Sequence, residues 1–238
     1  MLEIDSLSYT LKERTLLDAI SFSLQEGENL IILGENGAGK STLAKLLCGI
    51  IPSEKKVTLQ GQYIEDIPPQ KRAKLINYMP AKFSLFDPYT TVNDYLTLST
   101  YKRYLAPKRI EQILSLVQLS AHQNHYASTL SSGEQQLLLL ASSALQGAAI
   151  TIFDEPTSNL DPKKTKRLFE IVQKSEYFKQ KIVITHNLQF AYSLAYPVLY
   201  LEDAKIRYFE NNFFRPKNLA DYYHDTIMME GDYIVERL

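Results

Sequence analysis

A glycine-rich stretch, Gly34 to Thr42, is the part of the sequence whose residue types and spacing most clearly suggest chemistry. It matches the pattern G-x-x-x-x-G-K-[ST], with the apolar run Leu30–Leu33 before it and helix-forming residues after it. In that setting the glycines let the backbone curl until several N–H groups point at one anion. The candidate nucleotide-binding residues are Gly34, Glu35, Asn36, Gly37, Ala38, Gly39, Lys40, Ser41 and Thr42.

Two side chains of this stretch have further roles in phosphate chemistry. Lys40 adds a positive charge for the β- and γ-phosphates, and the hydroxyl of Ser41 can bind Mg²⁺. The alternative is a glycine-rich turn between a strand and a helix that binds nothing. Because every fixed position of the pattern is filled, the stretch predicts a site for a nucleotide and Mg²⁺.

Two acidic residues at the end of a second apolar run can supply the rest of a hydrolytic site. Asp154 and Glu155 follow the run Ala149–Phe153. A carboxylate at the end of a buried strand can hold Mg²⁺ through water, which suits Asp154, and Glu155 can then orient a water molecule or accept its proton. Such acid pairs are also common as solvated strand ends. The sequence lacks the N-K-x-D stretch that guanine selection usually needs.

Three further stretches have the order and wording found in the nucleotide-binding subunits of ATP-binding cassette (ABC) proteins. One opens a helix before the Asp154 run, one follows Glu155, and one ends an apolar strand. They are Leu130–Gln136, Ser158–Asp161 and Ile182–His186. The first is the specific motif, because other phosphate-loop families lack it. The sequence resembles this family from about residue 2 to about residue 236.

The resemblance implies a role for each matching residue. The stretch from Gly34 to Thr42 would bind the phosphates of ATP, while Ser41 and Asp154 would serve Mg²⁺. Glu155 would be the catalytic carboxylate, and His186 would reach the γ-phosphate from the end of its strand. The activity implied is hydrolysis of ATP to ADP and phosphate.

The resemblance also implies that the working unit is a pair of chains. Ser131 and Gly133, in one stretch with Ser132 and Glu134, would contact the γ-phosphate bound to a second copy of the protein. A helix N-terminus with these residues presents N–H groups to an anion. Asp161 would lie at the seam of this head-to-tail dimer.

Three positions depart from the family pattern. Where an aromatic side chain would stack on adenine the sequence has Leu11, and Tyr9 either takes that role or belongs to the core. Where a glutamine would contact Mg²⁺ and water it has Ala81, or Lys82 if the loop is shifted. Ser132 replaces a glycine. The departure at Ala81 puts the hydrolysis rate or the coupling to a partner in doubt.

The elements that must position these residues alternate between β and α. Alternating apolar residues indicate β-structure over 2–33, with a turn at 12–15. Further strands are expected at 57–59, 76–79, 149–153, 182–185 and 198–201, and helices at 69–75, 162–174 and 188–195. A hairpin is expected over 226–235. This pattern predicts an α/β fold, a doubly wound and mainly parallel sheet of the P-loop NTPase type. An antiparallel β-subdomain and an inserted α-helical subdomain complete it.

Helical character over 91–147 defines the insertion. Val92, Tyr95, Leu96, Leu98 and Leu105 are spaced loosely for a first helix, and the next runs from Pro107. A third helix begins after the stretch Leu130–Glu134 and ends near Gln146. We expect one domain over 1–238, divided into a RecA-like core with its β-subdomain at 1–90 and 148–210, the helical subdomain at 91–147, and a tail at 211–238.

Composition limits the classes of function. Lys and Arg number 26 against 27 Asp and Glu, so no overall charge favours nucleic acid and we expect no such partner. Cys48 is the sole cysteine, which excludes an internal disulfide. No signal peptide is evident, and the apolar stretch Leu137–Phe153 is too short to span a membrane. These features favour the cytoplasm.

The leading hypothesis is an ATPase subunit that powers a membrane importer from the cytoplasmic face of the cell membrane. Residues 217–223, with the hairpin that follows, resemble the ends of importer ATPases for iron-siderophore, haem or cobalamin complexes. The stretch 72–80 also resembles this group of importer ATPases. An integral membrane permease would dock at Ala81–Tyr95, where the apolar side chains are Phe83, Leu85, Phe86 and Tyr89. These side chains could instead close the joint between subdomains.

Two other functions fit the same motifs. The chain could be a soluble cassette ATPase in a process such as iron–sulfur assembly, or an ATP-gated scaffold that does not hydrolyse ATP because Ala81 replaces the glutamine. The presence of Glu155 and His186 argues against the scaffold.

Overall fold

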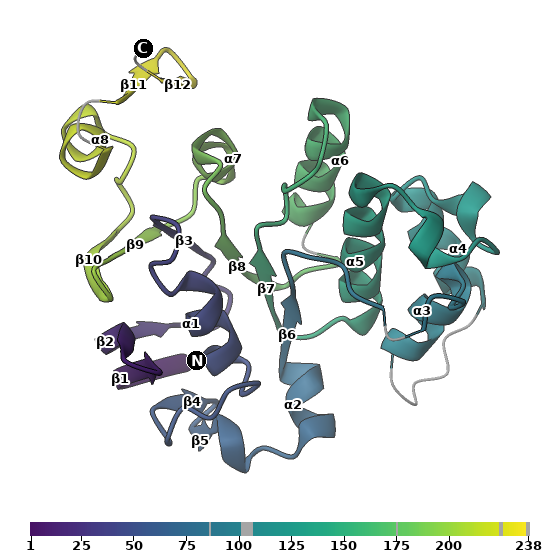
Figure 1. The fold of residues 1–238 in the computed structure, drawn as a ribbon, viewed down its shortest axis with the longest axis horizontal. Helices are drawn as coiled ribbons and strands as arrows, with labels where there is room; N and C mark the ends of the chain where they lie inside the picture. Colours follow the sequence, from purple (N-terminus) through teal and green to yellow (C-terminus); the bar gives the residue numbers. More distant parts are fainter. Residues whose placement is uncertain (86, 101–106, 175, 224–225, 237–238) are drawn as a thin grey trace.

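The computed structural model describes residues 1–85, 87–100, 107–174, 176–223 and 226–236. A six-stranded sheet with the order β10-β9-β3-β8-β7-β6 forms its centre (Figure 1). Neighbouring strands are parallel except β10, which is antiparallel to β9. The strands are β3 (Leu30–Gly34), β6 (Ile76–Met79), β7 (Ile150–Asp154), β8 (Gln180–Ile184), β9 (Val198–Glu202) and β10 (Lys205–Glu210). The predicted mainly parallel sheet is confirmed.

Strand β8 corrects one predicted boundary. The sequence pattern places this strand at 182–185, whereas β8 begins at Gln180 and ends at Ile184. Gln180 is polar but buried, because its Nε2 donates to the carbonyls of Gln25 and Glu28 at 3.0 and 2.7 Å. A polar side chain with internal partners can therefore extend a buried strand, which apolar periodicity does not reveal.

A second, antiparallel sheet has the order β2-β1-β4-β5. Its strands are β1 (Leu2–Leu11), β2 (Arg14–Leu24), β4 (Val57–Leu59) and β5 (Gln62–Tyr63). The turn expected at 12–15 is shorter than predicted, because Arg14 and Thr15 belong to β2 and pair with Leu11 and Thr10. The Thr10 and Thr15 hydroxyls lie 3.4 Å apart across the strands, so the ladder continues to the end of the hairpin.

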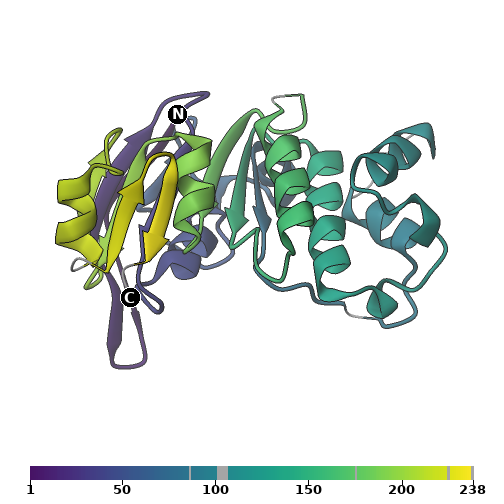
Figure 2. The same ribbon diagram turned by 90° about the horizontal axis from the view of Figure 1, so that it is seen from above.

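Helices cover the central sheet and form a separate group at one end of the molecule. They are α1 (Lys40–Leu47), α2 (Pro69–Leu75), α3 (Val92–Ser99), α4 (Pro107–Leu116), α5 (Ser132–Gln146), α6 (Pro162–Gln173), α7 (Leu188–Leu194) and α8 (Pro216–Tyr223), with short 3₁₀ turns at Ile64–Asp66, Ser120–His122 and Ala127–Thr129. Helices α3, α4 and α5 lie together, away from the antiparallel sheet (Figure 2). Leu98 is exposed near the end of α3, and the expected Leu105 lies outside the described residues.

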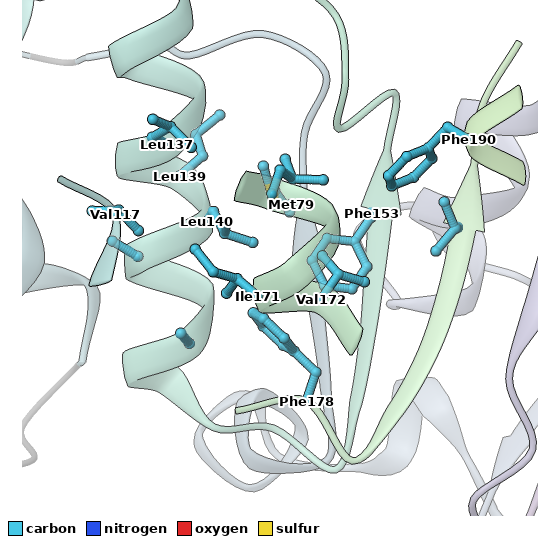
Figure 3. Packing of buried hydrophobic residues seen from close by; sticks show 14 of the residues in the cluster. Met79, Val117, Leu137, Leu139, Leu140, Phe153, Ile171, Val172, Phe178 and Phe190 are labelled. Carbon is cyan, nitrogen blue, oxygen red and sulfur yellow. The ribbon is translucent and has the colours of Figure 1, made fainter. Parts of the chain in front are cut away.

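The two faces of the central sheet belong to different hydrophobic clusters. On β3, Ile31 and Leu33 join the cluster with α5 and α6, while Leu30 and Ile32 join the cluster with α1 and the antiparallel sheet. Successive strand residues point to opposite faces, so a continuous apolar run serves both. Figure 3 shows Phe178 in the first cluster, and its ring lies 5.0 Å from that of Phe153 on β7.

The tail forms α8 and a two-stranded hairpin, β11 (Ile227–Glu230) and β12 (Tyr233–Glu236). This agrees with the expected hairpin. Gln189 on α7 holds it, because its Nε2 donates to the Asp232 carbonyl at 3.2 Å and its Oε1 accepts from the Ile234 N–H at 2.9 Å. Among the described residues, no helix has the length and apolar character that crossing a bilayer requires. The division into three ranges stays a prediction.

Candidate active site

Gly34 to Thr42 connects β3 to α1 through backbone conformations that favour glycine. Gly34 has φ +146°, and a Cβ there would lie 2.1 Å from the Leu201 carbonyl oxygen. At Gly39, with φ +93°, a Cβ would lie 2.5 Å from the Leu16 carbonyl oxygen. The backbones of β9, at Leu201, and of β2, at Leu16, therefore lie too close to these two glycines to leave room for a side chain. Since Gly39 supplies no side-chain cap, the first N–H groups of α1 are left for another acceptor, as an anion site requires.

Lys40 crosses the mouth of this loop. Its Nζ donates to the carbonyls of Gly34 at 2.7 Å and Glu35 at 2.8 Å, and the residue is 7% exposed. Burial lowers the pKa of Lys40, against the opposing attraction of nearby carboxylates. A phosphate group in the loop would supply the negative charge that a buried ammonium needs.

A cavity of about 320 Å³ joins the loop to the acidic strand end. It is lined by Arg14, Leu16, Asn36, Gly37, Gly39, Lys40, Ser41, Thr42 and Glu155. A second cavity, of about 520 Å³, borders the outer side of the loop and is lined by Arg14, Thr15, Leu16, Asp18, Glu35, Asn36, Gly37, Ala38, Glu202, Asp203 and Ala204. The fold thus brings the predicted loop and Glu155 to one cavity, and the β1–β2 hairpin borders both.

Asp154 ends β7 with its carboxylate buried, at 2% exposure. Its Oδ2 accepts a hydrogen bond of 2.7 Å from the Tyr78 hydroxyl, while its Oδ1 is buried without a hydrogen-bond partner in the described part of the chain. Burial, reinforced by this bond, raises the pKa of Tyr78. A buried carboxylate oxygen without a donor fits a hard cation, and the Ser41 hydroxyl, which lines the cavity, is a second oxygen ligand of the kind that Mg²⁺ takes.

Glu155 and His186 meet at the carboxyl ends of β7 and β8. His186 Nδ1 lies 2.8 Å from Glu155 Oε2, and the backbone N–H of His186 donates to the same oxygen at 3.3 Å. The Glu155 side chain is 16% exposed, whereas that of His186 is 66% exposed. Glu155 has φ +49°, a left-handed conformation that costs energy for a non-glycine residue.

Ser131 to Glu134 form a capping box at the start of α5. The Ser131 hydroxyl donates to Glu134 Oε2 at 2.7 Å, and the Ser131 N–H donates to the same oxygen at 2.8 Å. These bonds lower the pKa of Glu134. Gly133 is buried against a neighbouring loop, since a Cβ would lie 3.2 Å from the Asn159 carbonyl oxygen, and Ser132 is exposed. These four residues line neither cavity beside the phosphate loop of their own chain.

Asp161 and Ala81 both lie near the loop that follows Glu155. Asp161 caps α6, with Oδ1 accepting from the Lys164 N–H at 2.9 Å. The Ala81 carbonyl accepts a hydrogen bond of 3.3 Å from the Ser158 hydroxyl. Ala81, which stands where the family has a glutamine, is thus hydrogen-bonded through its backbone carbonyl to the loop at 158–161.

The structure adds site residues that the motifs do not reveal. Tyr9 packs against the core of the antiparallel sheet and Leu11 is 54% exposed, and neither lines the two cavities. Arg14 and Leu16 line both, and Tyr78 holds Asp154. Strand pairing places Arg14 and Leu16 beside the loop and Tyr78 beside Asp154, so no local sequence signal marks these three residues.

Comparison with known proteins agrees with this architecture. Residues 17–158 match the ABC transporter family. An uncharacterized ABC transporter ATP-binding protein of Haemophilus influenzae is 35% identical over 214 residues, which cover 85% of this chain and 80% of the relative. The glutamate/aspartate import ATP-binding protein GltL of Escherichia coli K12 is 32% identical, with 80% and 83% covered. The chain spans only 40% to 57% of the length of three other curated relatives.

Solved structures show the same fold. A dimeric ATP-binding cassette in a post-hydrolysis state, bound to ADP and Pi, superposes with a TM-score of 0.77 at 23% identity and covers 89% of this chain and 98% of that one. The family match covers more than half of the 238 residues and includes the loop, the capping box and the acidic strand end. The chain belongs to the ABC transporter family.

Proposed function

We propose that this chain hydrolyses ATP at the cavity between Gly34–Thr42 and Glu155, and that the reaction powers transport across a membrane. The observation that carries the proposal is the Glu155–His186 pair, 2.8 Å apart at the strand ends beside the phosphate loop. A carboxylate held by an exposed imidazole next to an anion site suits a water-activating base with a partner for the terminal phosphate.

Each residue has a defined task in this reaction. The N–H groups of the loop and Lys40 bind the β- and γ-phosphates, and Glu155 accepts a proton from the attacking water. The water oxygen bonds to the γ-phosphorus as the bond to the β-phosphate oxygen breaks, which leaves ADP and phosphate. His186 then contacts the γ-phosphate oxygens. Ser41 and Asp154 would hold Mg²⁺, which would supply positive charge to neutralise the phosphates.

The active unit in this proposal is a head-to-tail dimer of the chain. Ser131, Ser132 and Glu134 are accessible on the α5 end but lie outside the cavities of their own loop. A second copy would bring this helix N-terminus to the γ-phosphate, with Asp161 at the seam. The dimeric cassettes with the same fold support this arrangement.

We assign the transport step to import, with the chain bound to a permease at the cytoplasmic face of the membrane. GltL and other relatives are named as import ATP-binding proteins. In the docking segment Ala81–Tyr95, Tyr89 is 72% exposed, whereas Phe83 packs inward on Tyr95 with ring centroids 5.2 Å apart. Phe86 lies outside the described residues. Residues 217–223 of the tail resemble importer ATPases for metal chelates, and this resemblance favours a cargo of the iron-siderophore, haem or cobalamin type.

Two experiments test the proposal. Purified chain should release phosphate from ATP in the presence of Mg²⁺, and Glu155→Gln should not; equal release by both proteins would contradict the mechanism.

Affinity capture of the chain from its native membranes should recover an integral membrane permease. Recovery with no such protein would favour the soluble ATPase instead, and binding of ATP without any turnover would favour the scaffold.

A further inference from the structure

Arg14 stands at the boundary between the two cavities beside the phosphate loop. It is exposed at the start of β2 and lines both cavities. One hydrogen bond holds it there, from Nη2 to the Gly37 carbonyl at 3.2 Å. A single contact of this kind at an exposed site contributes little free energy, so a ligand can replace it.

The same boundary has no aromatic side chain. Among the described residues, neither cavity is lined by Phe, Tyr or His. Arg14 pairs with Leu11 across the hairpin, and Leu16 follows on β2. Arg14 and Leu16 line both cavities together with Asn36 and Gly37, so the planar guanidinium and the Leu16 side chain are among the groups that a flat ring leaving either cavity would meet.

We propose that Arg14 binds the base of the nucleotide, with the guanidinium plane stacked on the purine ring and Leu16 beside it. This proposal rests on the proposed phosphate site at Gly34–Thr42. Arginine suits the task because its guanidinium is planar, weakly hydrated and stacks on aromatic faces, whereas a lysine ammonium is a compact point charge. Arg14 leaves the Gly37 carbonyl when the base arrives.

The main competing role for Arg14 is a contact to phosphate through charge alone. The two roles separate on substitution. Arg14→Lys keeps the charge and loses the plane, while Arg14→Tyr keeps a plane and loses the charge. A comparison of ATP with inorganic tripolyphosphate also distinguishes the two roles, because tripolyphosphate carries the phosphate charge without a base.

Calorimetric titration of the full chain with ATP and with tripolyphosphate, both with Mg²⁺, tests the proposal. We expect Arg14→Ala and Arg14→Lys each to weaken ATP binding about tenfold and to leave tripolyphosphate binding unchanged, since cation–π stacking contributes on the order of 1 kcal/mol. Arg14→Tyr should keep ATP affinity close to that of the unaltered chain. Lys12→Ala is the matched control, because Lys12 lies in the same hairpin and lines neither cavity.

The remaining outcomes overturn the inference. Normal ATP affinity in Arg14→Lys, or an equal loss of tripolyphosphate affinity in Arg14→Ala, would assign Arg14 to phosphate. Unchanged binding in every variant would remove it from the site. If the unaltered chain bound neither ligand, the proposed phosphate site would fail as well, which distinguishes that failure from an error about Arg14 alone.

Discussion

Oε2 of Glu155 receives two contacts from His186: the ring Nδ1 at 2.8 Å and the backbone N–H at 3.3 Å. The carboxylate is thereby oriented at the end of β7, while the imidazole stays largely exposed. The pair joins two strands that are adjacent in the sheet and 31 residues apart in the chain.

Replacing the carboxylate should stop the reaction and spare binding. We expect Glu155→Gln to lower kcat by about 10²- to 10⁴-fold, the usual contribution of a general base, and to leave the affinity for ATP nearly unchanged. An ATP-bound dimer should then accumulate in size-exclusion chromatography. Glu170→Gln, on the outer surface of α6, is the control and should hydrolyse ATP normally. Normal turnover in Glu155→Gln would remove Glu155 from its role.

Removing the phenol oxygen beside the buried Asp154 carboxylate should destabilise the folded chain. Tyr78→Phe leaves Asp154 Oδ2 without its 2.7 Å donor in a buried position. An unsatisfied buried acceptor costs about 1–3 kcal/mol, to be measured by urea unfolding without nucleotide. Tyr126→Phe, at a residue that is 46% exposed, is the matched control. Equal stability of the two variants would show that the Tyr78 bond does not hold Asp154.

Gly34 should tolerate no side chain. With φ +146° and the Leu201 carbonyl oxygen 2.1 Å from a Cβ, Gly34→Ala forces the backbone of β3 or β9 to move. We expect a loss of about 3 kcal/mol or more in the free energy of unfolding. Gly231→Ala also has positive φ, at +61°, but meets no atom within 4 Å and should cost only about 1 kcal/mol. Similar losses would show that the loop can rearrange freely.

A glutamine at position 81 should speed the reaction. Ala81→Gln introduces an amide that can orient the attacking water near Mg²⁺, and one such hydrogen bond in the transition state corresponds to about tenfold in kcat. The KM for ATP should stay constant. Ala81→Leu has a similar size without the amide and should not gain activity. A gain in both variants would point to packing and not to the water.

The stability that the capping box contributes to the folded chain should depend on pH through the ionisation of Glu134. Bonds from Ser131 hold the pKa of Glu134 below its usual value of 4.5, so their stabilising contribution is present above pH 4.5 and is lost as pH falls through the folded-state pKa. Glu134→Gln should therefore be less stable than the unaltered chain at pH 7, by about 1 kcal/mol, and the difference should shrink below pH 4.5. A difference independent of pH, measured by urea unfolding, would contradict this assignment.

Much of the fold follows from local pattern. Continuous apolar runs separated by helical segments predict the parallel sheet, and the structure confirms it. The errors fall where a polar residue continues a strand: Gln180 extends β8 through its own hydrogen bonds, and Arg14 extends β2 to the end of the hairpin. Hydrophobic periodicity does not detect either residue, because both are polar and are held by hydrogen bonds and not by apolar packing.

The sequence by itself determined the phosphate loop, the acidic pair and the family motifs, because each is a contiguous pattern whose chemistry is set by residue type and spacing. Tertiary structure decided which side chains surround them. Tyr78 reaches Asp154 only because β6 pairs with β7, and Arg14 reaches the loop only because β2 begins beside Gly37. Such contacts depend on strand pairing across the fold, and no short stretch of sequence encodes them.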